Sequence, residues 1–595
     1  MQTNRLTWAR NQAILNVREQ PCQTEKELLQ SNPARRVILK FIEKLQDKDS
    51  RLLNILPEKL ASQPPPTIAE RLHPLLIKLL DQPLEEAGPS SELGEEILEK
   101  REKFHQFIER LYDFWRDYTR FIVKWTGFGS TEEGTRPYLQ FNEELDELTE
   151  LVRSTYRSIA ENITRTHPIV YRQVSAGFEV GLAVDKKEFN YPEPIKKKFG
   201  QVPVIEQVTI EPPFVIDPPM NKRTGRFKEA EDNPIAGSEV NPQDWLCYPA
   251  KVGDLRIDVF FHQDFTDLGT SLANLFELAT GDELKEKPDA VYAYGLDPGD
   301  MEGYGDLPTV FYRDEENGLL YGALPREPRF GYFGYVKKLM LTLHNTIAMD
   351  KGRLPLHGAM TRIFIKGLEP VTVAVMGGSG AGKSETLEAF RVIGKDLIQE
   401  TEIICDDMGS LGIDESGSVL GYGTETGAFV RLDDLQKGYA FSQLDRSIFM
   451  SPQKTNARAL MPVAPIEKVL EGVPIDYFFY ANNYEEVDSE HPIIERLESP
   501  EEAISVFSEG ARMSKGTTTE KGLSHTYFAN PFGPPQFKEK HDELAKRFFD
   551  QFYENDVFVG QLRTRLGITG METEGPQKAA RELLELLQNS DSNTD

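Results

Sequence analysis

The sequence has few cysteines and no long apolar run. Its three cysteines, Cys22, Cys247 and Cys405, lie far apart and form no CxxC pair, which argues against a disulfide framework and favours a reducing compartment. No apolar run approaches the roughly 18 residues that a membrane-spanning helix needs. The first residues, MQTNRLTWARNQ, contain no apolar segment typical of an export signal. We therefore expect a cytoplasmic protein with no membrane association.

Positive charge is also scarce relative to negative charge. The chain carries 96 Asp and Glu against 68 Lys and Arg, a formal net charge of −28, which would repel the phosphate backbone of a nucleic acid. We expect no nucleic-acid partner. Any anionic ligand must be held by a local cluster of Lys and Arg acting against the field of the whole chain. The hydrophobic content of 39% is typical of a folded protein, and 595 residues can form two or three domains.

Three segments with different patterns follow one another along the chain. Residues 1–165 predict an all-helical accessory domain, because apolar residues from Phe104 to Ile122 recur at the spacing of one helical face. No catalytic pattern occurs there, and we expect these helices to mediate self-association or a protein contact. Residues 166–330 contain short β-like runs separated by Pro, Gly and Asp. Residues 331–595 alternate strands with helices, so the fold class is mixed α/β, or α+β.

A glycine-rich stretch in the last segment predicts a phosphate-binding loop. GGSGAGKS, residues 377–384, satisfies GxxxxGK[ST] between the strand-like VTVAVM and the helix-like SETLEAFRVI. Glycines let successive backbone N–H groups converge on phosphate oxygens, and the helix N-terminus adds partial positive charge. Lys383 would neutralise β- and γ-phosphate oxygens, and the Ser384 hydroxyl would bind Mg²⁺. The candidate residues are Gly378, Ser379, Gly380, Ala381, Gly382, Lys383 and Ser384. The alternative, a glycine-rich turn with a surface lysine, fits these flanks poorly.

Acidic, imidazole and amine side chains flank this loop in the sequence. Asp406 and Asp407 follow a predicted strand, and such a pair after a phosphate loop favours a metal or base role over simple solvation. His357 precedes the loop, although a lone histidine is more often a core residue. Lys337 and Lys338 would ordinarily be a surface pair. A lysine can bind a metal only when neutral, which requires burial and a nearby cation to lower its pKa.

The order of these motifs resembles phosphoenolpyruvate carboxykinase of the ATP-using type. The resemblance covers residues from about 220 to 570 and consists of TGRFKEAED, YFGYVKK, LPLHGAM, GGSGAGKS, CDD, TETGAF and TNARA. It implies a P-loop-containing catalytic body, with residues 166–330 as a substrate-binding domain and 331–595 as a nucleotide- and metal-binding catalytic domain. The implied reaction is metal-dependent decarboxylation of oxaloacetate, with phosphoryl transfer from a nucleotide to give phosphoenolpyruvate and carbon dioxide.

The resemblance also assigns roles around the metal and the donor. Lys338, His357 and Asp407 resemble the family's transition-metal ligands, usually for Mn²⁺. Lys383 and Ser384 resemble its nucleotide-phosphate and Mg²⁺ residues, and Asp406 would orient water or metal beside Asp407.

Further roles concern the substrate. Arg226 resembles the arginine that grips the substrate carboxylate, and Arg458 resembles the arginine that bridges substrate and transferring phosphoryl group. Tyr332 resembles the tyrosine beside the substrate and carbon dioxide site, while Lys337 and Ser379 resemble further substrate-side contacts. Bidentate guanidinium groups suit the carboxylate and phosphoryl oxygens of such a substrate. Without the other motifs, each arginine would be read as a surface or ion-pair residue.

Two departures leave the substrate open. Tyr335 stands where an acid is common in the family's lysine motif, and FKEAED follows TGR in place of a basic run. The GKSE sequence with His-Gly before it and Asp-Asp after it resembles HPr kinase, a hydroxyl kinase for which an aspartate would serve as base. A third alternative is a catalytically silent regulatory relative.

The identity of the donor is equally open. We expect ATP, because the loop lacks the cysteine of the GTP-using branch, with GTP or pyrophosphate as alternatives. Arg563 and Arg565 are candidates for contacts to the nucleotide.

Overall fold

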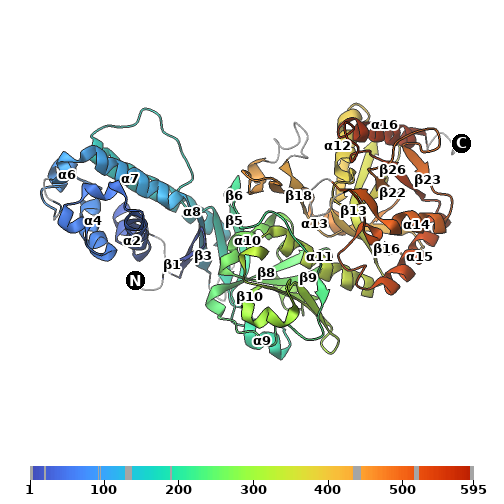
Figure 1. The fold of residues 1–595 in the computed structure, drawn as a ribbon, viewed down its shortest axis with the longest axis horizontal. Helices are drawn as coiled ribbons and strands as arrows, with labels where there is room; N and C mark the ends of the chain where they lie inside the picture. The colour runs from blue at the N-terminus through green and yellow to red at the C-terminus, as the bar shows by residue number, and fades with distance from the viewer. Residues whose placement is uncertain are drawn as a thin grey trace. The chain divides into compact units, whose positions relative to one another are not determined.

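The computed structural model describes residues 4–18, 22–91, 93, 96–126, 137–187, 190–432, 444–514 and 522–589. It is a mixed α/β structure with large sheets (Figure 1). The chain forms two compact units. The first contains Met1–Lys186 and Val204–Glu211, and the second contains Lys187–Pro203 and Pro212–Asp595. The boundary expected at residue 330 therefore lies inside the second compact unit. Among the described residues, none of the helices has the length and apolar character to cross a membrane.

The first unit combines helices with a sheet. The strands β1 (Arg5–Ala9), β2 (Gln12–Val17), β3 (Thr119–Trp125), β4 (Val180–Asp185) and β5 (Val204–Ile210) pair in that order. The helices are α1 (Glu25–Gln30), α2 (Asn32–Asp47), α3 (Glu58–Ala61), α4 (Pro65–Lys78), α5 (Leu84–Ala87), α6 (Glu96–Glu99), α7 (Arg101–Arg116) and α8 (Pro137–Thr164). Their apolar faces meet in one cluster, where the rings of Phe41 and Phe107 pack edge to face.

The expectation of an all-helical region before residue 165 was wrong. Three strands, β1, β2 and β3, lie among the described residues of this region, and the apolar pattern read as one helical face is divided between α7 and β3. The helix ends at Arg116, whereas Phe121 and Ile122 belong to a strand with a parallel neighbour on each side. Phe121, Ile122 and Val123 are all buried, so this strand is a continuous apolar run without the alternation that would mark it in the sequence.

The second unit contains several sheets. One has the order β8 (Trp245–Val252), β9 (Leu255–His262), β10 (Ala290–Leu296), β12 (Leu319–Pro325), β11 (Val310–Asp314) and β7 (Lys228–Glu229). A second has the order β21 (Val473–Pro474), β17 (Val419–Gly423), β16 (Met408–Ile413), β13 (Leu354–Ile365), β14 (Val371–Met376), β22 (Tyr477–Asn482), β26 (Phe558–Arg563) and β23 (Ile494–Arg496), with β15 (Ile398–Cys405) paired to β13. Smaller sheets are β18 (Gly427–Arg431), β20 (Arg458–Pro462), β19 (Ile448–Met450) and β6 (Phe214–Ile216), and the hairpin of β24 (Ala511–Met513) and β25 (Leu523–His525).

Alternating side chains of β14 cover both faces of the second sheet. Val373 and Val375 pack with α12 (Lys383–Ile393) and α16 (Glu574–Asn589). Ala374 and Met376 lie in the cluster that contains the apolar face of α15 (Lys538–Glu554). Figure 1 shows α16 on one side of β22 and β26 and α15 on the other. Because this part of the sheet is buried on both faces, its strands are almost continuously apolar.

Strand direction brings several chain segments to one edge of this sheet. β14, β22 and β26 are parallel, so their carboxyl ends meet at the same edge. β13 and β16 run antiparallel, with His357 opposite Met408. The His357 carbonyl accepts a hydrogen bond of 3.0 Å from the Gly377 N–H. The segments that carry His357, the glycine-rich loop and Asp407 are therefore neighbours.

Candidate functional site

A pocket of about 500 Å³ in the second unit is lined by residues from most of the sequence motifs. The predicted site residues that line it are Arg226, Tyr332, Lys338, His357, Gly378, Ser379, Gly380, Gly382, Lys383, Asp406, Asp407 and Arg458. Lys337 and Ala381 are buried beside it. The side chain of Ser384 lies outside the described residues, so its Mg²⁺ role stays a prediction. The structure thus brings together residues that are distant in the sequence.

The glycine-rich stretch forms a strand–loop–helix turn at this pocket. The loop follows β14, and α12 begins at Lys383. Gly380 and Gly382 have φ angles of +78° and +93°. Residues other than glycine adopt this left-handed backbone conformation only at a cost in free energy. The Lys383 Nζ donates hydrogen bonds to the carbonyls of Gly377 and Gly378, at 2.7 and 3.1 Å. Burial lowers the pKa of Lys383, so an anion in the pocket would stabilise its charged form.

Asp407 joins two lysines and a histidine. Its Oδ2 accepts from Lys338 Nζ at 2.6 Å and lies 2.7 Å from Lys337 Nζ, and its Oδ1 lies 3.1 Å from His357 Nε2. Burial favours the protonated carboxyl, but the charges of Lys337 and Lys338 outweigh burial and hold the pKa of Asp407 well below its usual value. Asp407 is therefore an anion at neutral pH and a poor base.

The histidine contact suggests a place for a cation. His357 Nδ1 lies 2.5 Å from the Ala529 carbonyl, which can only accept, so Nδ1 carries the ring proton. Burial lowers the pKa of His357 to about 4, so at neutral pH Nε2 has no proton and its lone pair faces the Asp407 carboxylate. A cation between these two acceptors would remove that conflict. Imidazole and carboxylate ligands suit a divalent transition metal such as Mn²⁺.

Lys338 can supply a third ligand atom. Burial, together with the neighbouring Lys337 charge, lowers the pKa of Lys338 to about 8, against the opposing effect of Asp407. A neutral amine is thus accessible near neutral pH. Within the described residues no group of three or more His, Cys, Asp and Glu could hold a metal, so a metal site here depends on lysine as a ligand.

Glu425, in the TETGAF motif, is a site residue that the sequence interpretation missed. It is buried, and its Oε2 lies 3.1 Å from Lys337 Nζ. Burial lowers the pKa of Lys337, but Asp407 and Glu425 outweigh burial and raise it above its usual value. Burial, with the charge of Asp407, raises the pKa of Glu425 to about 7. The sequence signal that could have identified Glu425 is an acidic residue within a motif otherwise made of small and apolar residues.

Two arginines face each other across neighbouring strands at the pocket. Arg458 in β20 is the register partner of Arg431 in β18, and both line the pocket. The Arg458 guanidinium lies 5.2 Å from the centre of the Phe429 ring, and among the described residues its buried Nε has no hydrogen-bond partner. Like charges directly opposite each other destabilise a sheet, and an anion bound between these two arginines would offset that repulsion. The sequence interpretation named Arg458 but not Arg431.

The TGR loop reaches the pocket from a different part of the chain. Arg226 is exposed and lines the pocket with Arg223. The Thr224 N–H donates a 3.1 Å hydrogen bond to the Tyr335 hydroxyl. Tyr335, at the position where carboxykinases commonly have an acid, thus helps to position the loop that carries Arg226. Tyr332 is buried at the start of α11 (Phe333–Asp350).

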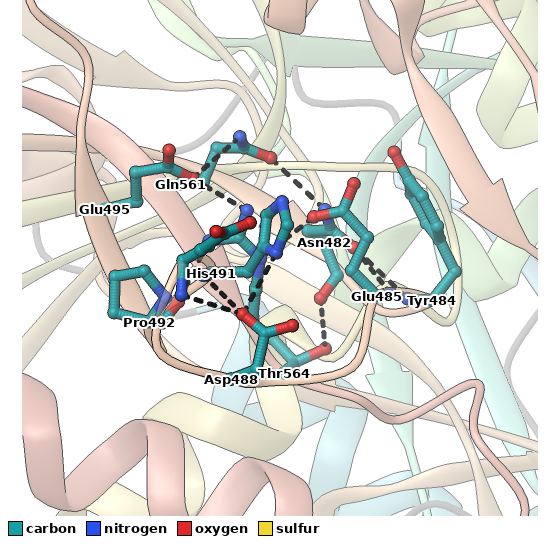
Figure 2. A network of polar contacts seen from close by, with 11 residues as sticks. Asn482, Tyr484, Glu485, Asp488, His491, Pro492, Glu495, Gln561 and Thr564 are labelled. Carbon is teal, nitrogen blue, oxygen red and sulfur yellow. Dashed lines mark hydrogen bonds and ion pairs between the residues drawn. The ribbon is translucent and has the colours of Figure 1, made fainter.

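Arg563 and Arg565, the candidates for contacts to the nucleotide, are not among the residues that line the pocket. Arg563 donates to Glu485 and Glu495, at 2.9 and 2.7 Å, and to the Pro492 carbonyl at 2.9 Å. Figure 2 shows these three partners around the end of β26. Arg563 is therefore committed to internal contacts, which argues against its proposed role. Arg565, which follows Arg563 closely in the sequence, is also buried.

Compared with known proteins, the chain matches no protein-family model and no curated protein sequence. The carboxykinase resemblance therefore depends on the motifs and on the geometry of the pocket.

Proposed function

We propose that this chain is a phosphoenolpyruvate carboxykinase-like enzyme, which decarboxylates oxaloacetate and transfers a phosphoryl group to the product. The observation that carries the proposal is that Arg226 and Arg458 line the same pocket as the glycine-rich loop and the Lys338–His357–Asp407 cluster. A pocket for a phosphoryl donor alone has no need of the Arg226 loop. A dicarboxylate acceptor beside the donor would use both arginines.

The donor would bind at the glycine-rich loop, as Mg²⁺-ATP with its Mg²⁺ at Ser384. The loop N–H groups and the N-terminus of α12 favour an anion there. Lys383 would exchange its two loop carbonyls for phosphate oxygens, which carry more negative charge.

The metal would be held by Lys338 Nζ, His357 Nε2 and the Asp407 carboxylate. Mn²⁺ bound there would stabilise the negative charge that develops on the substrate oxygen. Lys337 keeps its proton, because Asp407 and Glu425 are both close to it, and it holds Asp407 in the ionised form.

The reaction needs no proton transfer by the protein. Arg226 holds a carboxylate of oxaloacetate beside Tyr332, and the bond to the carboxylate β to the ketone breaks to release carbon dioxide. The electron pair left behind forms the enolate double bond, with negative charge on oxygen. That oxygen attacks the γ-phosphorus, and the bond from phosphorus to the bridging oxygen of the nucleoside diphosphate breaks. Lys383 and Arg458 neutralise charge on the transferring group.

This reaction requires no general base, whereas the reaction of a hydroxyl kinase requires one. Asp407, with its strongly lowered pKa, is unsuited to remove a proton from an alcohol. Glu425 has a pKa near neutrality, but the pocket lining does not include it. Asp406 lines the pocket and is the residue that a hydroxyl kinase would use.

An acceptor screen tests the proposal. Purified full-length chain with Mn²⁺ and Mg²⁺-ATP is incubated with oxaloacetate, with a panel of alcohols and serine-containing proteins, or with buffer alone. Phosphorus NMR identifies the product. Phosphoenolpyruvate supports the carboxykinase assignment, a phosphate ester with the panel supports the kinase, and no transfer to any acceptor supports a silent relative.

A further inference from the structure

The backbone carbonyls of the glycine-rich loop accept hydrogen bonds from side chains, one within the stretch and three outside it. Lys383 binds the first two, those of Gly377 and Gly378. Arg512 Nη1 donates to the Ser379 carbonyl at 2.9 Å. Asn483 Nδ2 donates to the Gly380 carbonyl at 2.9 Å. Thr564 Oγ1 donates to the Ala381 carbonyl at 2.7 Å. Five successive carbonyls therefore point toward protein donors.

The three outer donors come from three separate elements. Asn483 follows β22, Arg512 lies in β24, and Thr564 follows β26. All three are buried. Figure 2 shows Thr564 beside Asn482 at the ends of β26 and β22, where the Thr564 N–H donates to the Asn482 carbonyl at 2.8 Å. This edge of the sheet thus holds two of the donors in fixed positions.

Asn483 also connects the hairpin to the loop. Its Nδ2 donates to the Met513 carbonyl at 3.0 Å, and its Oδ1 accepts from the Met513 N–H at 2.8 Å. Arg512 lies directly over Gly378, where an added Cβ would be 2.5 Å from the arginine Cδ. A glycine is required there because the arginine stem occupies the space that any side chain would need.

Holding the carbonyls determines where the N–H groups point. In a planar trans peptide the C=O and the following N–H point in opposite directions. Arg512, by holding the Ser379 carbonyl outward, turns the Gly380 N–H away from itself. Thr564 does the same for the Gly382 N–H through the Ala381 carbonyl. These N–H groups are thereby fixed before any anion binds, which lowers the entropic cost of binding.

We propose that Arg512, which also lines the pocket, together with Asn483 and Thr564 forms a brace that sets the affinity of the glycine-rich loop for a polyphosphate by holding the loop carbonyls. The brace is a set of positioning residues that act through loop carbonyls. The inference rests on the proposed function only in that the loop binds a phosphoryl donor. It is independent of the acceptor and of the Mn²⁺ site.

Thr564 offers the cleanest test, because its replacement changes no charge. Tripolyphosphate with Mg²⁺ is titrated into the full-length chain by calorimetry. Thr564→Val keeps the shape but loses the donor, and we expect its affinity to fall about five- to tenfold, the size of one lost hydrogen bond. Thr564→Ser restores the hydroxyl and should bind like the unmodified chain. Mn²⁺ affinity, measured in the same variants, should not change.

Arg512→Met gives an independent test if the valine variant fails to fold, with Arg496→Met as the matched surface control. Arg512→Met should weaken tripolyphosphate binding, and Arg496→Met should not. Unchanged affinity in both Thr564→Val and Arg512→Met would overturn the brace. If the unmodified chain binds no tripolyphosphate, both the brace and the proposed function fail. If the unmodified chain makes no phosphoenolpyruvate but the variants bind tripolyphosphate more weakly than it does, the brace is supported and only the proposed function is refuted.

Discussion

The Nζ of Lys338 lies 2.6 Å from Asp407 Oδ2, the same oxygen that lies 2.7 Å from Lys337 Nζ. The two lysines differ in their second partner. Lys337 also lies beside Glu425, and its pKa is raised, whereas among the described residues Lys338 pairs with no second carboxylate, and burial lowers its pKa to about 8. Of two adjacent amines, Lys338 is therefore the one that can lose its proton and bind a metal.

Mn²⁺ affinity should rise with pH up to about 8. Below that pH a proton must leave Lys338 before Mn²⁺ can bind, so the dissociation constant should fall by about tenfold per pH unit and then level off. His357, with a pKa of about 4, is already neutral in this range and adds no slope. Electron paramagnetic resonance of free Mn²⁺ measures the affinity. Lys338→Met should bind weakly and lose the slope, and a slope that survives in this variant contradicts the assignment.

Replacing His357 tests the imidazole ligand. His357→Ala should weaken Mn²⁺ binding by more than about a hundredfold, because it removes the nitrogen that faces Asp407. His491→Ala, at an exposed histidine, is the control and should leave the affinity unchanged. Undiminished Mn²⁺ affinity in His357→Ala would show that this histidine is not a ligand.

The strand–loop–helix around the glycine-rich stretch could be predicted because its signals are local. Glycines, a preceding apolar run and a following helical pattern all lie within residues 371–393. The grouping of Lys338, His357 and Asp407 was predicted only through resemblance, and in the structure all three residues line one pocket.

Other features depend on segments far apart in the chain. Glu425 meets Lys337, and Arg512 meets the Ser379 carbonyl, only after the sheets pack. In the first unit, β3 was read as helix because its burial comes from strand neighbours and not from its own periodicity.

Lys383 should be essential for transfer. Lys383→Ala removes the buried ammonium beside the loop, and we expect turnover to fall by about a thousandfold, typical of losing a main electrostatic contact to the phosphoryl group. Lys395→Ala, at an exposed position beyond α12, is the control. Circular dichroism checks that both variants fold. Near-normal turnover in Lys383→Ala would exclude the loop as the donor site.

Arg226 should act mainly on substrate capture. Arg226→Ala loses a guanidinium that a carboxylate would bind, so the KM for oxaloacetate should rise about ten- to a hundredfold, with a smaller change in kcat. Arg313→Ala serves as the control, because Arg313 pairs with Asp350 and does not line the pocket. Unchanged kinetics of Arg226→Ala at low oxaloacetate would remove this residue from the site.

The stoichiometry of one reaction tests the central claim most directly. The full-length chain is given Mn²⁺, Mg²⁺-ATP and oxaloacetate, and carbon dioxide, phosphoenolpyruvate and ADP are followed together. The account predicts that all three appear in equal amounts and that Arg458→Ala suppresses all three together. ADP formed without phosphoenolpyruvate, or a phosphoryl group found only on a hydroxyl acceptor, would contradict it.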